Sequence, residues 1–317
     1  REIDLIEEAV RLYGYDKIPE INISAVSLES TEDPDEELID SVREKLRNLG
    51  LVETFSKSMV DGKYCSPFGK DPVKIEHPLN EEMNHLRNSL LLPLLLNADK
   101  NIRRKNVKIN IFETGRIFYY DNGNICEKDS AAVLLSGTKT QQIWHTPEAI
   151  YDFYDIKGIV VQLLKDFNVS SPEFSNEDIP AYFDKSQSLN IIAGGKTAGT
   201  FGLISKETAA AFDIKQNVYC FEADLDQIRQ IMSASEHSIN ELSKYPKVTK
   251  DVSVLMPVSE SAEKVGKYLK KISGNILEDV FVADIYQGEQ VGNKKSYTFR
   301  MSFQPYEKTL SDKDIEK

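Results

Sequence analysis

The sequence has few of the residues that build zinc sites and disulfide frameworks. Its three cysteines, Cys65, Cys126 and Cys220, are far apart and odd in number, and it holds only four histidines. No Cys-x-x-Cys pair and no His-x-x-x-His spacing occurs, so neither a zinc ribbon nor a disulfide-stapled fold is supported. Scattered reduced thiols are typical of cytoplasmic proteins, and we expect that location.

Long apolar runs and glycine-rich phosphate loops are missing as well. The longest apolar run, Leu90–Leu96, contains Pro93 and falls far short of the ~20 residues that cross a bilayer, so we expect no membrane partner. Neither the Walker pattern nor a strand-anchored G-x-G-x-x-G is present, which excludes nucleotide sites of those two kinds. The acidic first residues do not fit a signal peptide, and a start without methionine favours a fragment of a longer protein.

Acidic residues outnumber basic ones overall, but the charge is unevenly distributed. The 317 residues carry a net charge of −12, which argues against a protein that coats nucleic acid over its whole surface. Between positions 243 and 317, however, basic residues slightly outnumber acidic ones. This distribution permits local RNA contact in the C-terminal part of the chain.

The C-terminal part has the pattern of a small α/β domain. Apolar periodicity and β-branched content predict a strand, a helix and two more strands, at Asp251–Pro257, Ser261–Ser273, Leu277–Tyr286 and Ser296–Gln304. Thr309 and Asp312 then fit the start of another helix in capping-box style. The order β-α-β-β-α is one strand short of a ferredoxin-like unit, so we expect the chain to be cut inside this domain.

The last of these strands alternates between large apolar and small polar side chains. The apolar set is Tyr297, Phe299, Met301 and Phe303, and the polar set is Ser296, Thr298, Arg300 and Ser302. Successive side chains of a strand point to opposite faces of a sheet. We therefore expect the apolar face to pack on the helices and the polar face to stay open.

Residues 36–232 have the pattern of an antiparallel α+β module, because strands arrive in runs with helices interposed irregularly. The expected helices are Glu36–Asn48, Asn88–Lys105 and Asp155–Phe167. The expected strands include Leu51–Val60, a strand pair within Val107–Tyr120 around Thr114 and Gly115, Ala131–Ser136, Leu189–Ala193, Thr200–Ile204 and Val218–Ala223. Polar linkers are expected at 21–35 and 233–242. We expect Trp144 and the nearby aromatics Tyr151, Phe153 and Tyr154 to lie in the core.

Residues 1–14 have the apolar spacing of a helix that ends at Gly14. Asp4, Glu7 and Glu8 are spaced i, i+3 and i+4, which places three carboxylates on one face of this helix. Hard oxygen ligands of this kind suit Mg²⁺. On spacing alone, a solvated acidic face near a helix N-terminus is the better interpretation.

Short strings throughout the chain resemble the β subunit of bacterial phenylalanyl-tRNA synthetase. Ser243–Pro246, Asp251–Ser253 and Thr309–Asp312 resemble its anticodon-binding domain. His77–Leu79, Leu86–Pro93, Phe112–Phe118 and Asp152–Gly158 resemble its synthetase-like module, although His77 and Leu94 depart from the usual Asn and Gly. Asp4–Glu8, Arg11, Gly14–Asp16 and Ile18–Pro19 resemble the end of the small helical domain that precedes this module.

The resemblance implies a domain order and a set of partners. It implies the end of a helical domain at 1–20, a non-catalytic class II synthetase-like module at 36–232, and a truncated ferredoxin-fold anticodon-binding domain at 243–317. It further implies an (αβ)₂ tetramer in which the α subunit uses ATP and the β subunit contacts tRNA(Phe). Asp4, Glu7 and Glu8 would bind Mg²⁺ together with one more Asp that would precede Arg1, so the site would be incomplete here.

The residues at two class II motifs agree with a module that does not catalyse. A catalytic subunit has an Arg shortly after a Gly-Arg-hydrophobic-aromatic string, whereas Gly115–Phe118 is followed by Tyr119 and Tyr120. The glycine-rich strand Gly199–Ile204 is followed by Ser205 and Lys206 in place of the Glu-Arg of the third motif. Without these cations, stabilisation of phosphoryl chemistry is implausible.

Two other classes of function stay open. One is a binding module unrelated to translation, in which the ferredoxin-like domain is regulatory. The other is a metal-dependent hydrolase that would use Asp4, Glu7, Glu8 and His85.

Overall fold

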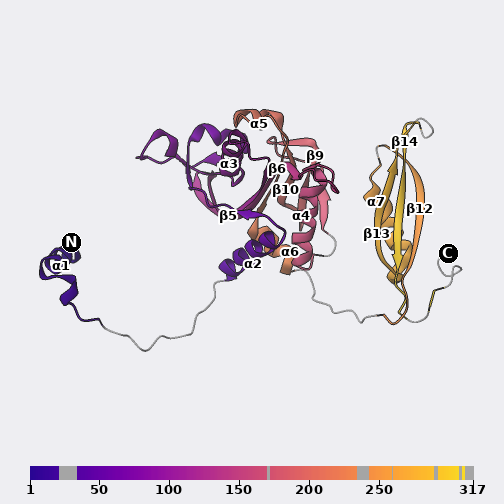
Figure 1. Ribbon diagram of the computed structural model, residues 1–317, viewed down its shortest axis with the longest axis horizontal. Helices are drawn as coiled ribbons and strands as arrows, with labels where there is room; N and C mark the ends of the chain where they lie inside the picture. The colour runs from indigo at the N-terminus through magenta and orange to yellow at the C-terminus, as the bar shows by residue number, and fades with distance from the viewer. Residues whose placement is uncertain are drawn as a thin grey trace. The chain divides into compact units, whose positions relative to one another are not determined.

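The computed structural model describes residues 1–20, 34–169, 172–233, 243–258, 260–288, 292–306 and 309–310. Contacts within the chain divide it into two compact units, Arg1–His237 and Ser238–Lys317 (Figure 1). Almost all of the two expected linkers, and of the helix expected from Thr309 onward, lies outside the described residues. In the described part of the chain, no helix is both long and apolar enough to cross a bilayer.

The helices of the first unit follow the amphipathic pattern of the sequence. They are α1 Glu2–Tyr13, α2 Pro34–Asn48, α3 Leu91–Arg103, α4 Phe153–Asp166, α5 Lys206–Ala211 and α6 Leu225–Ser233, with 3-10 helices η1 Tyr15–Lys17, η2 Gly62–Tyr64, η3 Ser66–Phe68 and η4 Glu81–Met83. The expected helices in the positions of α1, α2, α3 and α4 are confirmed, with ends shifted by a few residues. Along α2, Leu38, Val42 and Leu46 recur every four residues and are buried on one side.

A nine-stranded sheet forms the centre of this unit, in the order β1-β5-β6-β11-β10-β9-β8, with β3 paired to β5 and β7 to β6. Its strands are β1 Val52–Glu53, β3 Asp71–Pro72, β5 Lys108–Asp121, β6 Asn124–Thr140, β7 Ala149–Ile150, β8 Glu173–Ser175, β9 Phe183–Ala193, β10 Lys196–Ile204 and β11 Val218–Asp224. A separate ribbon pairs β2 Met59–Val60 with β4 His85–Leu86. Only β1 and β5 run parallel among the paired strands that the structure describes, so the expected antiparallel α+β module is confirmed.

Apolar side chains cover both faces of this sheet. Along β6, Val133 and Leu135 belong to one buried cluster and Leu134 belongs to another, because neighbouring residues of a strand face opposite ways. The first cluster includes residues of α2, α4 and α6, and the second includes residues of α3 and the segment around α5 (Figure 1). The module is therefore a three-layer structure with the sheet in the middle.

Two strand expectations in this unit are wrong. The segment Leu51–Val60 is not one strand but crosses from β1 in the large sheet to β2 in the ribbon. The expected strand pair around Gly115 is a single 14-residue strand, β5, paired along its length with β6. Gly115 does not mark a turn; it makes room for Arg87, whose Nη2 would lie 2.6 Å from a Cβ at this position.

The expected burial of the aromatics around Trp144 is correct for only half of them. Tyr151 and Phe153 pack against the first apolar cluster. Trp144 is 95% exposed and Tyr154 is 70% exposed, so their placement in the core is wrong. Trp144 lies in the short turn between β6 and β7, where its ring contacts only the His145 ring among the aromatic contacts found.

The second unit is a three-stranded antiparallel sheet in the order β12-β14-β13, with the helix α7 on one face. The elements are β12 Val248–Pro257, α7 Ala262–Ser273, η5 Gly274–Ile276, β13 Leu277–Tyr286 and β14 Lys294–Phe303. The four apolar residues of β14 are buried, as the alternation predicts. Two of them, Tyr297 and Phe299, form a core with Met256 to which Val265 and Leu269 of α7 also contribute.

Candidate functional site

Tyr119 follows the Gly115–Phe118 string, after which a catalytic class II module is expected to carry an arginine. Tyr119 on β5 packs against the second apolar cluster, and the Lys70 ammonium lies 4.7 Å from its ring centroid. Burial raises the pKa of Tyr119 above its ordinary value. The nearby Arg116 is exposed and is paired with Glu127 and Asp129 on β6, at 3.0 and 3.3 Å. Tyr119 carries no positive charge, and the Arg116 guanidinium is already paired with two carboxylates.

A buried carboxylate lies on the same face of the sheet. Glu222 of β11 accepts hydrogen bonds from the Ser89 hydroxyl at 2.9 Å and from the Leu90 amide at 2.6 Å. Burial raises the pKa of Glu222, and the positive Lys70 and these two donors oppose that rise. The Glu222 carboxylate therefore holds the chain in place just before α3. Both of its oxygens accept hydrogen bonds from this segment, which is a structural role.

A buried ion pair joins the same segment to β5. Arg87 Nη1 lies 2.5 Å from Glu113 Oε1, and both side chains are almost fully buried. Arg87 Nε also donates to the Arg116 carbonyl oxygen at 2.9 Å. The same Glu113 oxygen accepts the Ser56 amide at 3.2 Å, so the pair also holds the segment that follows β1. A charge-assisted pair of this kind contributes mainly when both partners stay in place.

The glycines of the expected third motif have structural roles. A Cβ at Gly199 would lie 2.8 Å from the Glu222 carbonyl oxygen. Gly202 has φ +148°, and a Cβ there would lie 2.2 Å from the Ser188 hydroxyl oxygen. The close approach of β10 to its two neighbouring strands therefore accounts for both glycines without any bound substrate.

The three carboxylates proposed as Mg²⁺ ligands are exposed on α1. Glu8 accepts Arg11 Nη2 at 2.5 Å. The chemistry of the three carboxylates suits a hard cation, but Glu8 is already paired with a positive group. In the described ranges, no group of three metal-ligating side chains is assembled. Magnesium binding by Asp4, Glu7 and Glu8 stays a prediction.

His85, the further residue of the hydrolase alternative, is held in the ribbon of β2 and β4. Its Nδ1 lies 2.7 Å from the Asn84 Oδ1. The ring is packed against Gly62, where a Cβ would lie 2.2 Å from Nδ1. Within the described residues the structure does not join His85 to the α1 carboxylates as a metal-binding group.

The C-terminal sheet has one open face, and aromatic side chains lie on it. In the strand register, Phe281 of β13 is opposite Arg300 and Tyr286 is opposite Ser296, so both share the face of the polar residues of β14. Phe281 is 48% exposed and Tyr286 is 46% exposed. Arg300 on the same face forms a two-pronged ion pair with Asp251, at 2.8 Å for both contacts. This pair lowers the pKa of Asp251, and its two contacts restrict the orientation of the guanidinium.

Sequence reasoning missed Phe281 and Tyr286. The signal was present in β13, where Val280 and Val282 alternate with Phe281, and these two valines pack on the helix side. The polar face was predicted from β14 alone, and the alternation in the neighbouring strand had to be aligned with it through the pairing register.

Comparison with known proteins decides the family. Residues 18–225 match the family described as "Phenylalanyl tRNA synthetase beta chain CLM domain", and residues 243–317 match "Ferredoxin-fold anticodon binding domain". The first match covers about two thirds of the chain. The chain belongs to the phenylalanyl-tRNA synthetase β chain family. The resemblance found in the short sequence strings is thereby confirmed.

Curated members of the β chain family align along the whole chain. The phenylalanine–tRNA ligase β subunit of Syntrophus aciditrophicus is 29% identical over 326 residues, which cover 99% of this chain and 40% of that protein. The Francisella tularensis β subunit is 32% identical, and the alignment covers 98% of this chain and 39% of that protein. The chloroplastic β subunit of Porphyra purpurea is 30% identical, and the alignment covers 100% of this chain and 44% of that protein. The chain spans about two fifths of the length of these relatives.

Solved structures support the fold of this β-chain module. A pyrrolysyl-tRNA synthetase of Desulfitobacterium hafniense superposes with a TM-score of 0.51 and 14% identity, over 66% of this chain and 73% of that protein. At this identity the match concerns the fold alone. The first unit is thus a class II synthetase-like α+β module, and the second is a ferredoxin-fold anticodon-binding domain.

Proposed function

We propose that this chain acts within phenylalanine–tRNA ligase, where it binds tRNA(Phe) through its C-terminal domain and supports the catalytic α subunit in an (αβ)₂ tetramer. ATP and phenylalanine would be used by the α subunit. The observation that carries the proposal is the open face of the C-terminal sheet, on which two half-exposed aromatic rings of β13 share the surface with Arg300 of β14.

That face has the chemistry needed for unstacked bases. Single-stranded bases stack on aromatic side chains and form hydrogen bonds along their edges. Phe281 and Tyr286 offer rings, and Ser253 and Thr298, whose hydroxyls lie 2.9 Å apart, offer hydroxyl groups between the strands. The slight excess of basic residues in 243–317 favours approach of a polyanion.

A supporting role for the synthetase-like module agrees with its filled catalytic face. Tyr119 stands where a phosphate-binding arginine would be needed, and Glu222 is held by Ser89 and Leu90. We expect this chain alone to give only background phenylalanine-dependent pyrophosphate exchange. Exchange above background that depends on phenylalanine would contradict this assignment.

The magnesium role of α1 is proposed as part of the longer protein. Asp4, Glu7 and Glu8 would supply carboxylate ligands, and the ion would stabilise the helix against their mutual repulsion. In the full β subunit, replacing Glu7 and Glu8 by Gln should weaken Mg²⁺ binding measured by calorimetry. Unchanged Mg²⁺ binding would rule out this assignment.

Binding of labelled tRNA(Phe) to the double variant Phe281→Ala/Tyr286→Ala tests the main proposal. Loss of a stacking ring costs about 1–3 kcal/mol per base, so we expect affinity to fall at least tenfold. Tyr268→Ala is the matched control, because Tyr268 is 62% exposed on α7, the helix that packs on the other face of the sheet. Equal affinity of the double variant and the parent chain would contradict anticodon binding by this face.

A further inference from the structure

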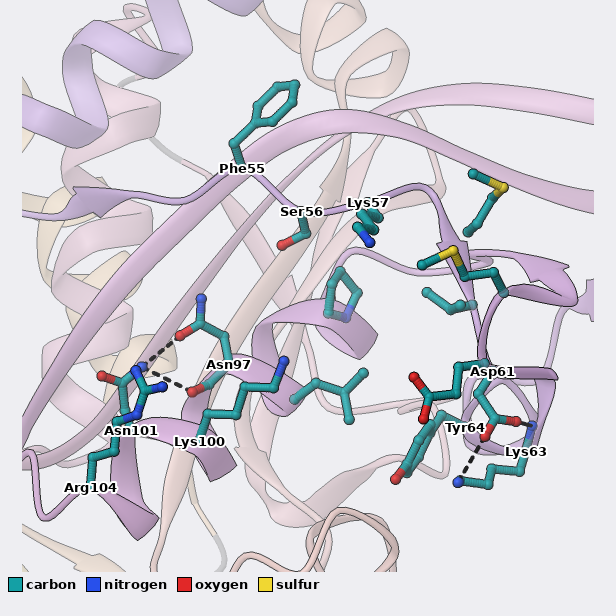
Figure 2. A pocket seen from close by; sticks show the side chains of 16 residues that line it. Phe55, Ser56, Lys57, Asp61, Lys63, Tyr64, Asn97, Lys100, Asn101 and Arg104 are labelled. Carbon is teal, nitrogen blue, oxygen red and sulfur yellow. Dashed lines mark hydrogen bonds and ion pairs between the residues drawn. The ribbon is translucent and has the colours of Figure 1, made fainter. Parts of the chain in front are cut away.

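A pocket on the synthetase-like module is not used by the proposed function. It lies between the extended segment after β1 and the helix α3, and its volume is about 620 Å³. Figure 2 shows Phe55, Ser56 and Lys57 along one side and Asn97, Lys100, Asn101 and Arg104 along another. The two sets are more than 30 residues apart in sequence, so the fold alone brings them together.

Three consecutive residues of the extended segment, Phe55, Ser56 and Lys57, line the pocket. The Thr54 amide donates to the Phe112 carbonyl oxygen at 2.8 Å, the Ser56 amide donates to buried Glu113, and the Ser58 carbonyl accepts the Arg87 amide at 2.8 Å. These three bonds hold the backbone of the segment against the module. Phe55 is 97% exposed, and Lys57 is also exposed.

The helix presents a second row of polar side chains. Asn97, Lys100, Asn101 and Arg104 are spaced i, i+3, i+4 and i+7, which places them on one face of α3 and its C-terminal cap. Asn101 Nδ2 donates to the Asn97 Oδ1 at 2.6 Å and leaves the Asn97 amide nitrogen free to donate elsewhere.

Three cations of the pocket have no acidic partner within the described part of the chain. Lys63 is neutralised by Asp61 at 2.7 Å, and Arg103, next along the helix, is paired with Asp99 and Asp213. Lys57, Lys100 and Arg104 form no ion pair with any described residue. Glu82 also lines the pocket and forms no ion pair with a described residue, so three unpaired cations face one unpaired carboxylate. In a strongly acidic chain, this local excess of positive charge favours an anionic ligand.

We infer that this pocket binds a nucleotide unit, with its phosphate at Lys57, Lys100 and Arg104 and its base against Phe55. An exposed aromatic ring beside a cationic groove is the arrangement that proteins use for single-stranded nucleic acid. The Ser56 hydroxyl and the Asn97 amide supply the hydrogen-bonding groups that a base edge or ribose needs. The inference goes beyond anticodon binding, because the site belongs to a different unit of the chain.

The test uses the 317-residue chain carrying Phe281→Ala/Tyr286→Ala, so that the C-terminal face does not contribute. Binding of a fluorescent ten-nucleotide oligo(U) is followed by anisotropy over a series of salt concentrations. Adding Lys100→Gln/Arg104→Gln should lower affinity at least tenfold at low salt. It should also reduce the slope of log K against log[salt] by about 1.4, since each lost phosphate contact to a single strand removes about 0.7.

Two further variants separate the site from general electrostatics. Phe55→Leu should lower affinity about fivefold or more and leave the salt slope unchanged, because it removes a stacking ring and no charge. Lys105→Gln/Lys108→Gln removes the same charge from exposed positions just beyond α3 and should change affinity less than twofold. Circular dichroism and urea midpoints confirm that each variant is folded.

Several outcomes would overturn the inference. One is an unchanged salt slope in Lys100→Gln/Arg104→Gln. Another is an equal loss of oligo(U) affinity in the Lys105→Gln/Lys108→Gln control. A third is weakened association of the site variant with the α subunit while its oligo(U) affinity is unchanged, which would indicate a protein partner. Displacement of oligo(U) by millimolar uridine monophosphate supports the site and identifies a free nucleotide as one source of the ligand. Persistence of binding under that competition supports the site and identifies the RNA strand as its ligand. If the pocket variants do not affect oligo(U) binding but Phe281→Ala/Tyr286→Ala still weakens tRNA(Phe) binding, the pocket inference is wrong and the proposed function is unaffected.

Discussion

The two sheets of this chain differ in how many of their faces are covered. The synthetase-like module buries apolar side chains on both faces of its nine-stranded sheet. The C-terminal sheet buries one face against α7 and leaves the other to solvent. A sheet covered twice gives stability and a rigid frame, whereas a sheet covered once keeps a flat surface for a ligand. The comparison teaches that the two units of one chain use a sheet in different ways, one as an interior layer and one as a half-open surface.

The largest effect should come from breaking the buried ion pair of the module. Arg87→Met leaves Glu113 charged and unpaired, so we expect the free energy of unfolding to fall by roughly 3–5 kcal/mol. Arg87→Met/Glu113→Leu removes both charges and should recover most of that loss. Urea unfolding followed by far-UV circular dichroism measures both.

Arg116→Met is the control for this prediction, because Arg116 forms only exposed ion pairs with Glu127 and Asp129. Such pairs contribute about 0–1 kcal/mol. If Arg87→Met lowers the free energy of unfolding no more than Arg116→Met does, the stability of the module does not depend on the buried Arg87–Glu113 ion pair.

The second prediction compares the stability cost of removing a phenylalanine from each face of the C-terminal sheet. Phe299 is 1% exposed and Phe281 is 48% exposed, although the two phenylalanines lie on adjacent strands. We expect Phe299→Ala to destabilise this domain by about 3 kcal/mol, at the lower end for a buried ring because the core is small. Phe281→Ala should stay within about 0.5 kcal/mol. Similar losses in thermal unfolding would mean that both faces are structural.

A smaller effect concerns pH and the buried carboxylate of Glu222. Burial raises the pKa of Glu222, so between its ordinary value and the raised value the folded chain binds more protons than the unfolded chain. The free energy of unfolding contributed by Glu222 must therefore fall as pH rises through that window. Relative to Glu222→Gln, the parent chain should lose stability from about pH 4.5 upward.

Urea midpoints of the parent chain and of Glu222→Gln at a series of pH values would check this prediction. Asp224→Asn is a suitable comparison, since Asp224 follows closely on β11 but is paired with Lys128 at 2.6 Å near the surface. A difference between the Glu222 curves that is constant with pH would show that the carboxylate keeps its ordinary pKa.

The smallest effect is expected at Trp144. Its side chain is 95% exposed, so Trp144→Ala should change the free energy of unfolding by less than about 0.5 kcal/mol. Because Trp144 is the single tryptophan of the chain, tryptophan emission should barely shift when the chain unfolds in urea. A large blue shift of the native emission would indicate that a partner or a second copy covers the ring.

Local periodicity in the sequence was enough to predict most helices and the buried face of β14. It failed where a long-range neighbour decides the outcome. Gly115 looks like a turn residue until Arg87 is placed against it. The aromatic content around Trp144 suggested a core, but only the path of the β6–β7 turn determines which rings face inward.

The candidate sites divide in the same way. The resemblance in short strings identified the family and the missing arginine, because these depend on contiguous residues. The open-face rings Phe281 and Tyr286 require the register between β13 and β14. The pocket requires the approach of α3 to the segment after β1, and no pattern within either segment indicates that approach.

The Ser56 amide connects the surface pocket to the buried ion pair of the module. It donates to Glu113, whose carboxylate is paired with Arg87, and it lies between the two residues, Phe55 and Lys57, that face the pocket. Exchange of this amide hydrogen with solvent requires the segment to leave its buried acceptor. Deuterium uptake at Ser56 therefore reports how often the pocket wall detaches from the core, and an occupant of the pocket should slow that uptake without touching the carboxylate.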